Sequence, residues 1–132
     1  KMSLQTILLL TLIGLAAGML SGMVGIGGGV VIVPALVFLL GLSQHQAQGT
    51  SLFILSLPVL LLAVMNYWRG GNVNWRFGLV IASTFVLGAF LGSKLTLRLP
   101  EAWVKLIFGL LMAYVSFQLI LAGYTGIQKD EP

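Results

Sequence analysis

The chain has 132 residues, of which 58% are hydrophobic and only 8% are charged, and its formal net charge is +4. No Asp, Glu, Lys or Arg occurs from Met2 to Trp68, which excludes a soluble domain of ordinary composition. The few basic residues are too scattered for a nucleic-acid-binding patch, and the lack of cysteine excludes a disulfide framework. The composition predicts an all-α, polytopic membrane protein that contacts the lipid bilayer and no nucleic acid.

About five apolar segments follow one another along the chain, at Gln5–Leu20, Val30–Leu42, Ser51–Trp68, Phe77–Leu97 and Val104–Tyr124. The last three reach the length of about 20 residues that a membrane span requires, and the first two are shorter. We expect residues 1–132 to form a single transmembrane domain with a polar tail at 125–132. Because the apolar pattern continues after the first segment, a first span is favoured over a cleaved signal peptide.

The most informative stretch is Gly18–Gly29, which joins the first two segments and contains six glycines in twelve residues. Each glycine inside a helix costs roughly 1 kcal/mol relative to alanine, so the stretch is expected to leave helical geometry. The two short segments then form a broken, glycine-rich helical hairpin. Non-helical backbone at membrane depth is tolerated only beside protein or a water-filled cavity, and broken helices indicate the binding sites of transporters.

Prolines refine the helix boundaries. Pro34 is expected in the first turn of the second segment, where its missing N–H costs little. Pro58 lies inside the third segment, where it is expected to kink the helix and leave the Ile54 carbonyl unpaired. Pro100 and Glu101 are expected to form the first turn of the last helix.

The acidic residues are confined to Glu101, Asp130 and Glu131. A proton relay or a cation pump usually places carboxylates within its spans, so this distribution disfavours a cation substrate. We find no metal-ligand cluster, cofactor motif or nucleophile–base pair, so no metal, no cofactor and no enzymatic activity are expected.

An anion site requires N–H donors at a helix start and a backbone that a ligand can approach. These features are present at Gly25, Gly27, Gly28 and Gly29, with the hydroxyl of Ser21 as an additional donor. A second set of donors is possible at Thr50 and Ser51, which follow the polar loop Ser43–Gln48 and could equally be a helix N-cap.

Three further residues are possible accessory groups. His45 is the only histidine and lies in the polar loop, where a solvated role is the simpler interpretation. Arg69 and Arg76 flank the loop between the third and fourth segments. They are either interfacial anchors or residues that attract anions to a pore mouth.

The loop charges give no strong orientation. If the first two helices return the chain to its starting side, one side receives four basic residues and the other receives Arg69, Arg76 and Lys129. A chain without clear bias can insert in both orientations, which favours an antiparallel homodimer that reproduces an inverted repeat. A single orientation fixed by the slight excess is the alternative.

The chain contains an ordered set of motifs: Gly18-x-x-Ser21-Gly22-x-x-Gly25-x-Gly27-Gly28-Gly29, Val33-Pro34-x-Leu36, Gly41, Ala47-x-Gly49-Thr50-Ser51, Gly70-x-x-x-Asn74-Trp75-Arg76, Gly88, Gly92, Leu99-Pro100 and Phe108-Gly109-Leu110-Leu111-Met112. In this combination the chain resembles a known family, the sulfite exporter TauE/SafE family of membrane transporters. The resemblance covers the chain from about Leu15 to Ala122. Family members are typically about twice as long and contain two halves of inverted topology, so this chain is similar to one half-repeat.

The resemblance implies an exporter of sulfite or an organosulfonate in the bacterial inner membrane. It also implies that the glycine motif, including Gly22, lines the substrate path with Ser21, Pro34, Thr50 and Ser51. Two other functions stay open, namely a passive anion channel of dual-topology subunits and a membrane assembly subunit that transports nothing. The absence of a carboxylate from the predicted spans leaves the coupling ion unassigned.

Overall fold

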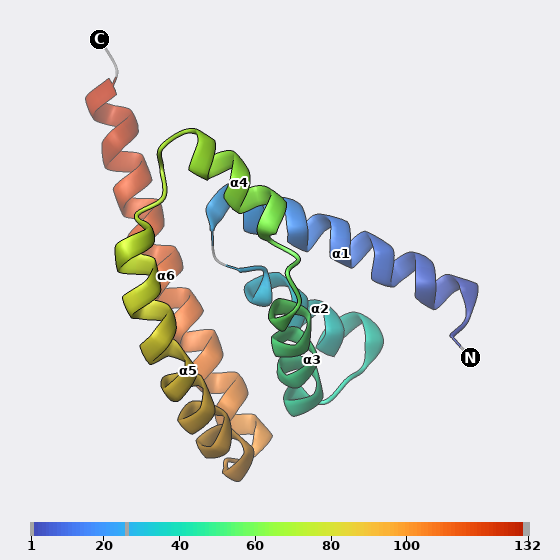
Figure 1. Cartoon of the computed structure of the whole chain (residues 1–132). Coiled ribbons are helices and arrows are strands. Elements are labelled where there is room, and N and C mark those ends of the chain that lie inside the picture. The colour runs from blue at the N-terminus through green and yellow to red at the C-terminus, as the bar shows by residue number, and fades with distance from the viewer. Residues whose placement is uncertain (1, 26, 131–132) are drawn as a thin grey trace. The chain divides into compact units, whose positions relative to one another are not determined.

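The computed structural model describes residues 2–25 and 27–130, and this part of the chain is entirely α-helical apart from short connections. Expectations for Lys1, Ile26, Glu131 and Pro132 lie outside the described residues. The helices, shown in Figure 1, are α1 (Leu4–Val24), α2 (Gly29–Leu40), α3 (Gln44–Ser56), α4 (Leu61–Arg69), α5 (Trp75–Arg98) and α6 (Glu101–Asp130). They divide into two compact units, Lys1–Leu97 and Arg98–Pro132, and each is described by itself.

Helix α1 is longer than predicted. Ser3 caps its N-terminus by accepting a hydrogen bond from the backbone N–H of Thr6, and the helix continues to Val24. Its apolar part, Leu4–Met23, is long enough to cross a bilayer, so the expectation of a short first segment ending at Leu20 is wrong. Glycine at isolated positions costs too little to end a long apolar helix, and α1 therefore passes through the first glycines of the predicted break.

Within Gly18–Gly29 the described residues leave helical geometry only between the end of α1 and the start of α2. Helix α2 begins at Gly29, directly after its N-cap residue Gly28. Pro34 consequently lies inside α2 and not in its first turn, which corrects the prediction. With 12 residues α2 is too short to span a bilayer, and it packs against both α1 and α3.

Helix α3 begins within the segment that was predicted to be a loop. Ser43 and Gln46 form a capping box, in which the Ser43 hydroxyl accepts from the Gln46 N–H and the Gln46 side chain accepts from the Ser43 N–H. The polar residues before Gly49 therefore form the first turn of α3, so Thr50 and Ser51 lie in the helix interior. The prediction that these two residues supply N–H donors at a helix start is wrong.

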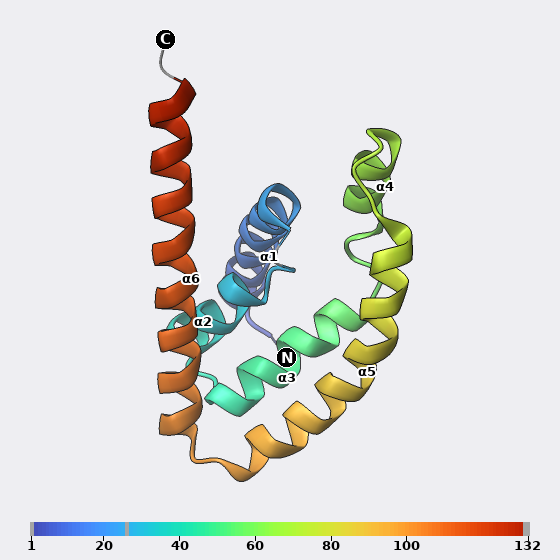
Figure 2. The same ribbon diagram turned by 90° about the vertical axis from the view of Figure 1, so that its left-hand side faces the viewer.

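The pair α3 and α4 is bent by 53° at the break that contains Pro58. Figure 2 shows α3 and α4 as two separate helices. The predicted kink is confirmed as a complete break of the helix, because the proline cannot donate to the Ile54 carbonyl. That carbonyl is not unpaired, however, since it accepts a hydrogen bond from the Leu57 N–H at 3.2 Å. Together α3 and α4 are long and apolar enough to count as one broken span.

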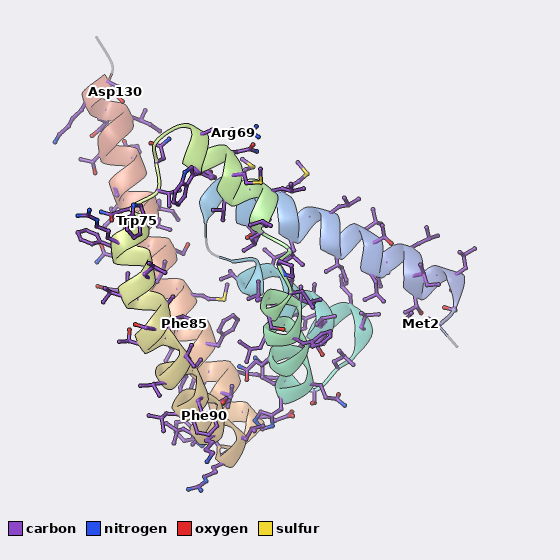
Figure 3. The ribbon with its side chains drawn as sticks, viewed as in Figure 1. Met2, Arg69, Trp75, Phe85, Phe90 and Asp130 are labelled. Atoms are coloured by element: carbon purple, nitrogen blue, oxygen red, sulfur yellow. The ribbon has the colours of Figure 1, made fainter. Side chains whose placement is uncertain are left out.

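The remaining helices are full-length candidates for membrane spans. Helix α5 has 24 residues. Arg69 and Trp75 lie at the two ends of the loop that precedes it (Figure 3). Helix α6 starts at Glu101, and the Pro100 carbonyl accepts hydrogen bonds from the N–H groups of its first turn. It continues past the predicted end at Tyr124 to Asp130.

The predicted fold class, an all-α polytopic membrane protein, is confirmed. By length and composition the described part of the chain contains three candidate spans, or four when α3 and α4 are counted as one. The difference from five segments arises because α2 is too short.

Candidate solute site at the break between α1 and α2

The backbone between α1 and α2 adopts a conformation that requires glycine. Gly25, Gly27 and Gly28 have φ angles of 76°, 83° and 75°. An L-residue with a side chain costs roughly 1–2 kcal/mol in this left-handed region. Gly25 closes α1 by donating its N–H to the Ser21 carbonyl at 2.7 Å, and Gly28 opens α2 by accepting from Ile32 at 2.9 Å. The glycine run therefore turns the chain sharply between two helices.

Ser21 lies in the last helical turn of α1, next to the glycine run. Its side chain is only 6% exposed, and within the described residues its hydroxyl has no hydrogen-bond partner. A β-carbon placed on Gly28 would lie 3.6 Å from the Ser21 β-carbon, so the hydroxyl is close to the start of α2. A buried hydroxyl without a partner costs about 1–3 kcal/mol, and such a group is a candidate ligand contact.

A first cavity of about 350 Å³ lies beside Ser21. Its walls come from α1, the glycine turn, α2, α3 and the connection to α4, and they include Gly27, Gly28 and Thr50. The Thr50 hydroxyl donates to the Gln46 carbonyl at 2.7 Å. Of the two hydroxyl side chains in this wall, Ser21 and Thr50, only Ser21 therefore still has a hydrogen to donate. The other side chains in the wall are apolar. The volume is in the range of small-molecule sites.

A second cavity of about 440 Å³ lies between the end of α1, α4 and the α4–α5 loop. Ser21, Gly27 and Leu60 line both cavities. The walls of the second cavity also carry the side chains of Tyr67 and of two loop residues, Asn72 and Asn74.

A hydrogen bond between α4 and α1 holds the broken end of α1. The Tyr67 hydroxyl donates to the Gly22 carbonyl at 2.6 Å, across 45 residues of sequence. The Gly22 carbonyl is one of the last four of α1, which have no partner within the helix. In a bilayer an unpaired carbonyl costs several kcal/mol, so Tyr67 stabilises the break.

The charges around the site favour a negative solute. Neither cavity has an acidic residue in its wall, and among the described residues no Asp or Glu precedes Glu101. Helix α2 starts at the first cavity, where its N-terminus carries roughly half a positive charge and N–H groups without helical partners. The described residues also contain no group of three His, Asp or Glu side chains that could hold a metal ion.

The predicted site residues divide into three groups. The first cavity is lined by Ser21, Gly27, Gly28 and Thr50, and the second by Ser21, Gly22, Gly25 and Gly27. Gly29, Pro34 and Ser51 line neither cavity. Gly29 and the buried Ser51 are nevertheless close, because a β-carbon on Gly29 would lie 3.3 Å from the Ser51 hydroxyl.

The three accessory candidates do not line either cavity. His45 lies in the first turn of α3 and not in a loop, which corrects the prediction. Arg69 ends α4, and the guanidinium of Arg76 lies 5.5 Å from the ring centre of Trp75 at the start of α5. The two arginines flank the loop whose asparagines line the second cavity.

The sequence did not indicate the roles of Tyr67, Asn72 and Asn74. Tyr67 reads as an interfacial aromatic anchor and the asparagines as turn residues. One signal was available, because a break in α1 leaves carbonyl groups that require a donor from elsewhere in the chain. No local pattern could show which distant hydroxyl supplies it.

Comparison with known proteins matches the chain, as a sequence, to a family model and to curated relatives. The family model described as "Sulfite exporter TauE/SafE" matches residues 7–131. A "Probable membrane transporter protein" of Xylella fastidiosa (strain Temecula1) is 35% identical over 121 residues, covering 91% of this chain and 44% of that protein. A protein of the same name from Haemophilus influenzae is 33% identical, covering 95% of this chain and 48% of that protein.

A third relative, the "Probable membrane transporter protein YunE" of Bacillus subtilis, is 30% identical over 84% of this chain and 40% of its own length. No solved structure matches the chain. The chain spans less than half the length of these curated relatives. Since the family model covers nearly all of the sequence, the chain belongs to the sulfite exporter TauE/SafE family of membrane transporters.

Proposed function

We propose that this chain forms the solute pathway of a transporter that exports a small anion, such as sulfite or an organosulfonate, across the bacterial inner membrane. The observation that carries the proposal is the buried Ser21 hydroxyl, which has no partner among the described residues and lines both cavities beside the glycine turn. The family name and the bacterial relatives support this class of solute and this membrane.

The anion would be held by neutral donors and not by a counter-ion. The Ser21 hydroxyl and the N–H groups at the start of α2 lie at one cavity, and the glycines allow a solute to approach the backbone. Charge-assisted hydrogen bonds of this kind bind an anion without a buried cation, which leaves the solute able to depart.

Replacing Ser21 by alanine tests the site. The change removes one hydrogen bond to a charged solute, worth about 1.5–3 kcal/mol, so the apparent affinity should fall by roughly 10- to 100-fold. Proteoliposomes should be assayed for flux of sulfite, sulfate, thiosulfate, sulfoacetate and chloride, with and without a pH gradient. Ser83→Ala is the matched control, because the Ser83 hydroxyl donates to the Val80 carbonyl of its own exposed helix.

Equal flux in Ser21→Ala and Ser83→Ala would overturn the proposed site. Failure of every anion to be transported or to compete would overturn the anion itself.

We further propose that the transporter is an antiparallel homodimer. The basic residues at the ends of α5 and α6 support it, because alternating spans place Arg69, Arg76 and Lys129 on one side and Lys94, Arg98 and Lys105 on the other. This equal number of basic residues on the two sides does not depend on the path of α1 and α2. A second, inverted copy would supply the other half of the inverted repeat that is typical of secondary transporters.

Thiol labelling tests this arrangement, since the chain has no cysteine of its own. Single cysteines at Asn72 and Leu99, in the loops before and after α5, should each react in part with a membrane-impermeant reagent from outside sealed vesicles and in part only after the vesicles are opened. Labelling of one position only from outside and of the other only after opening would show a single orientation and contradict the proposal.

A further inference from the structure

We propose that the second cavity is a separate entry station for the transported anion, with the amide nitrogen of Asn74 as a donor. This inference rests on the proposed function and adds a second binding position to it. The two cavities share Ser21, Gly27 and Leu60, so a solute in the second cavity lies beside the wall of the first.

The chemistry of the second cavity differs from that of the first. The first is apolar except for Ser21 and Thr50, whereas the second carries the phenol of Tyr67 and the carboxamides of Asn72 and Asn74. An anion leaving water encounters more polar groups there, which lowers the cost of removing its hydration shell.

Existing hydrogen bonds among the described residues exclude Tyr67 as a donor and fix Asn74, whereas the Asn72 carboxamide makes no such bond and can donate as well. The Tyr67 hydroxyl already gives its hydrogen to the Gly22 carbonyl. The Asn74 side-chain oxygen accepts the Phe77 N–H at 3.2 Å and so caps α5. Because this contact fixes the orientation of the carboxamide, the Asn74 NH₂ group is turned away from the cap.

The surroundings of the cavity favour a negative solute. Arg69 and Arg76 lie at the two ends of the loop that supplies Asn72 and Asn74. No acidic residue is present in the described chain before Glu101, so the field at this entrance is positive. Small oxyanions with several acceptor atoms match an amide donor at the entrance and the Ser21 hydroxyl further in.

The variant Asn74→Asp tests the station without removing the helix cap. Aspartate caps a helix as well as asparagine does, but it replaces the NH₂ donor by a negative charge. We expect the sulfite concentration for half-maximal flux to rise at least about tenfold, because two like charges repel strongly in a partly enclosed site. The unfolding temperature of the purified protein should not fall.

Two companion variants make the result specific. Asn66→Asp introduces the same charge on α4 at a residue that lines neither cavity, and it should change the half-maximal concentration less than about twofold. Asn74→Ser keeps an N-cap oxygen but lacks the amide donor. Its half-maximal sulfite concentration should therefore lie between those of wild type and Asn74→Asp.

Equal effects of Asn74→Asp and Asn66→Asp would overturn the entry station. If Ser21→Ala still weakens sulfite binding in that case, the proposed function stands and only the station fails. If none of the five anions is transported or competes in the wild-type protein and Ser21→Ala changes nothing, the proposed function fails as well.

Discussion

Replacing Gly27 by valine should reduce anion flux by about tenfold or more. Gly27 has a φ of 83°, and a β-branched residue is strongly disfavoured there, at a cost of at least roughly 1–2 kcal/mol. The residue also lines both cavities, and a β-carbon added to it meets no atom of the other described residues within 4 Å. The β-carbon therefore has space, but the valine side chain takes up volume at the wall that the two cavities share. Flux in proteoliposomes, together with the unfolding temperature, measures both effects.

Gly123→Ala is the control for this experiment. Gly123 lies within α6 and has an ordinary helical backbone, and no described residue of its own unit lies within 4 Å of an added β-carbon. Alanine there should maintain flux and raise helix stability by up to about 1 kcal/mol. Wild-type flux in Gly27→Val would mean that the glycine turn does not line the pathway.

Replacing Pro58 by alanine should straighten the broken pair α3–α4 and abolish most transport. Alanine supplies the N–H that can bond to the Ile54 carbonyl, and a proline within a helix is disfavoured by about 3 kcal/mol relative to alanine. A continuous helix would move Tyr67 away from the Gly22 carbonyl and Leu60 out of the walls of both cavities. Spin labels at Leu52 and Met65 should then be further apart than in the chain with the 53° bend.

The control is Pro100→Ala, because Pro100 precedes α6 and interrupts no helix. We expect wild-type flux from it. An unchanged label distance and unchanged flux in Pro58→Ala would contradict the prediction. The bend would then be maintained by packing against α1 and α2, and the broken pair could form without Pro58.

The sequence predicted the helical membrane fold and placed the principal break within the glycine run, because both depend on composition and local backbone preference. It was less accurate at boundaries. The polar residues after Ser43 look like a loop, yet their capping box starts α3 there, so Thr50 and Ser51 lie within the helix. Pro34 lies inside α2 and not in its first turn, because the N-cap at Gly28 starts that helix at Gly29.

What the sequence alone determined was the class of the protein, the absence of acidic residues from its apolar segments and the position where the chain must turn. These properties follow from hydropathy, charge and φ preferences, which act within a few residues or one bilayer thickness. Only the tertiary structure decided that Ser21 is buried beside two cavities, with no hydrogen-bond partner among the described residues, and that Tyr67 completes the end of α1. Such contacts join residues far apart in the chain, and packing between helices selects them.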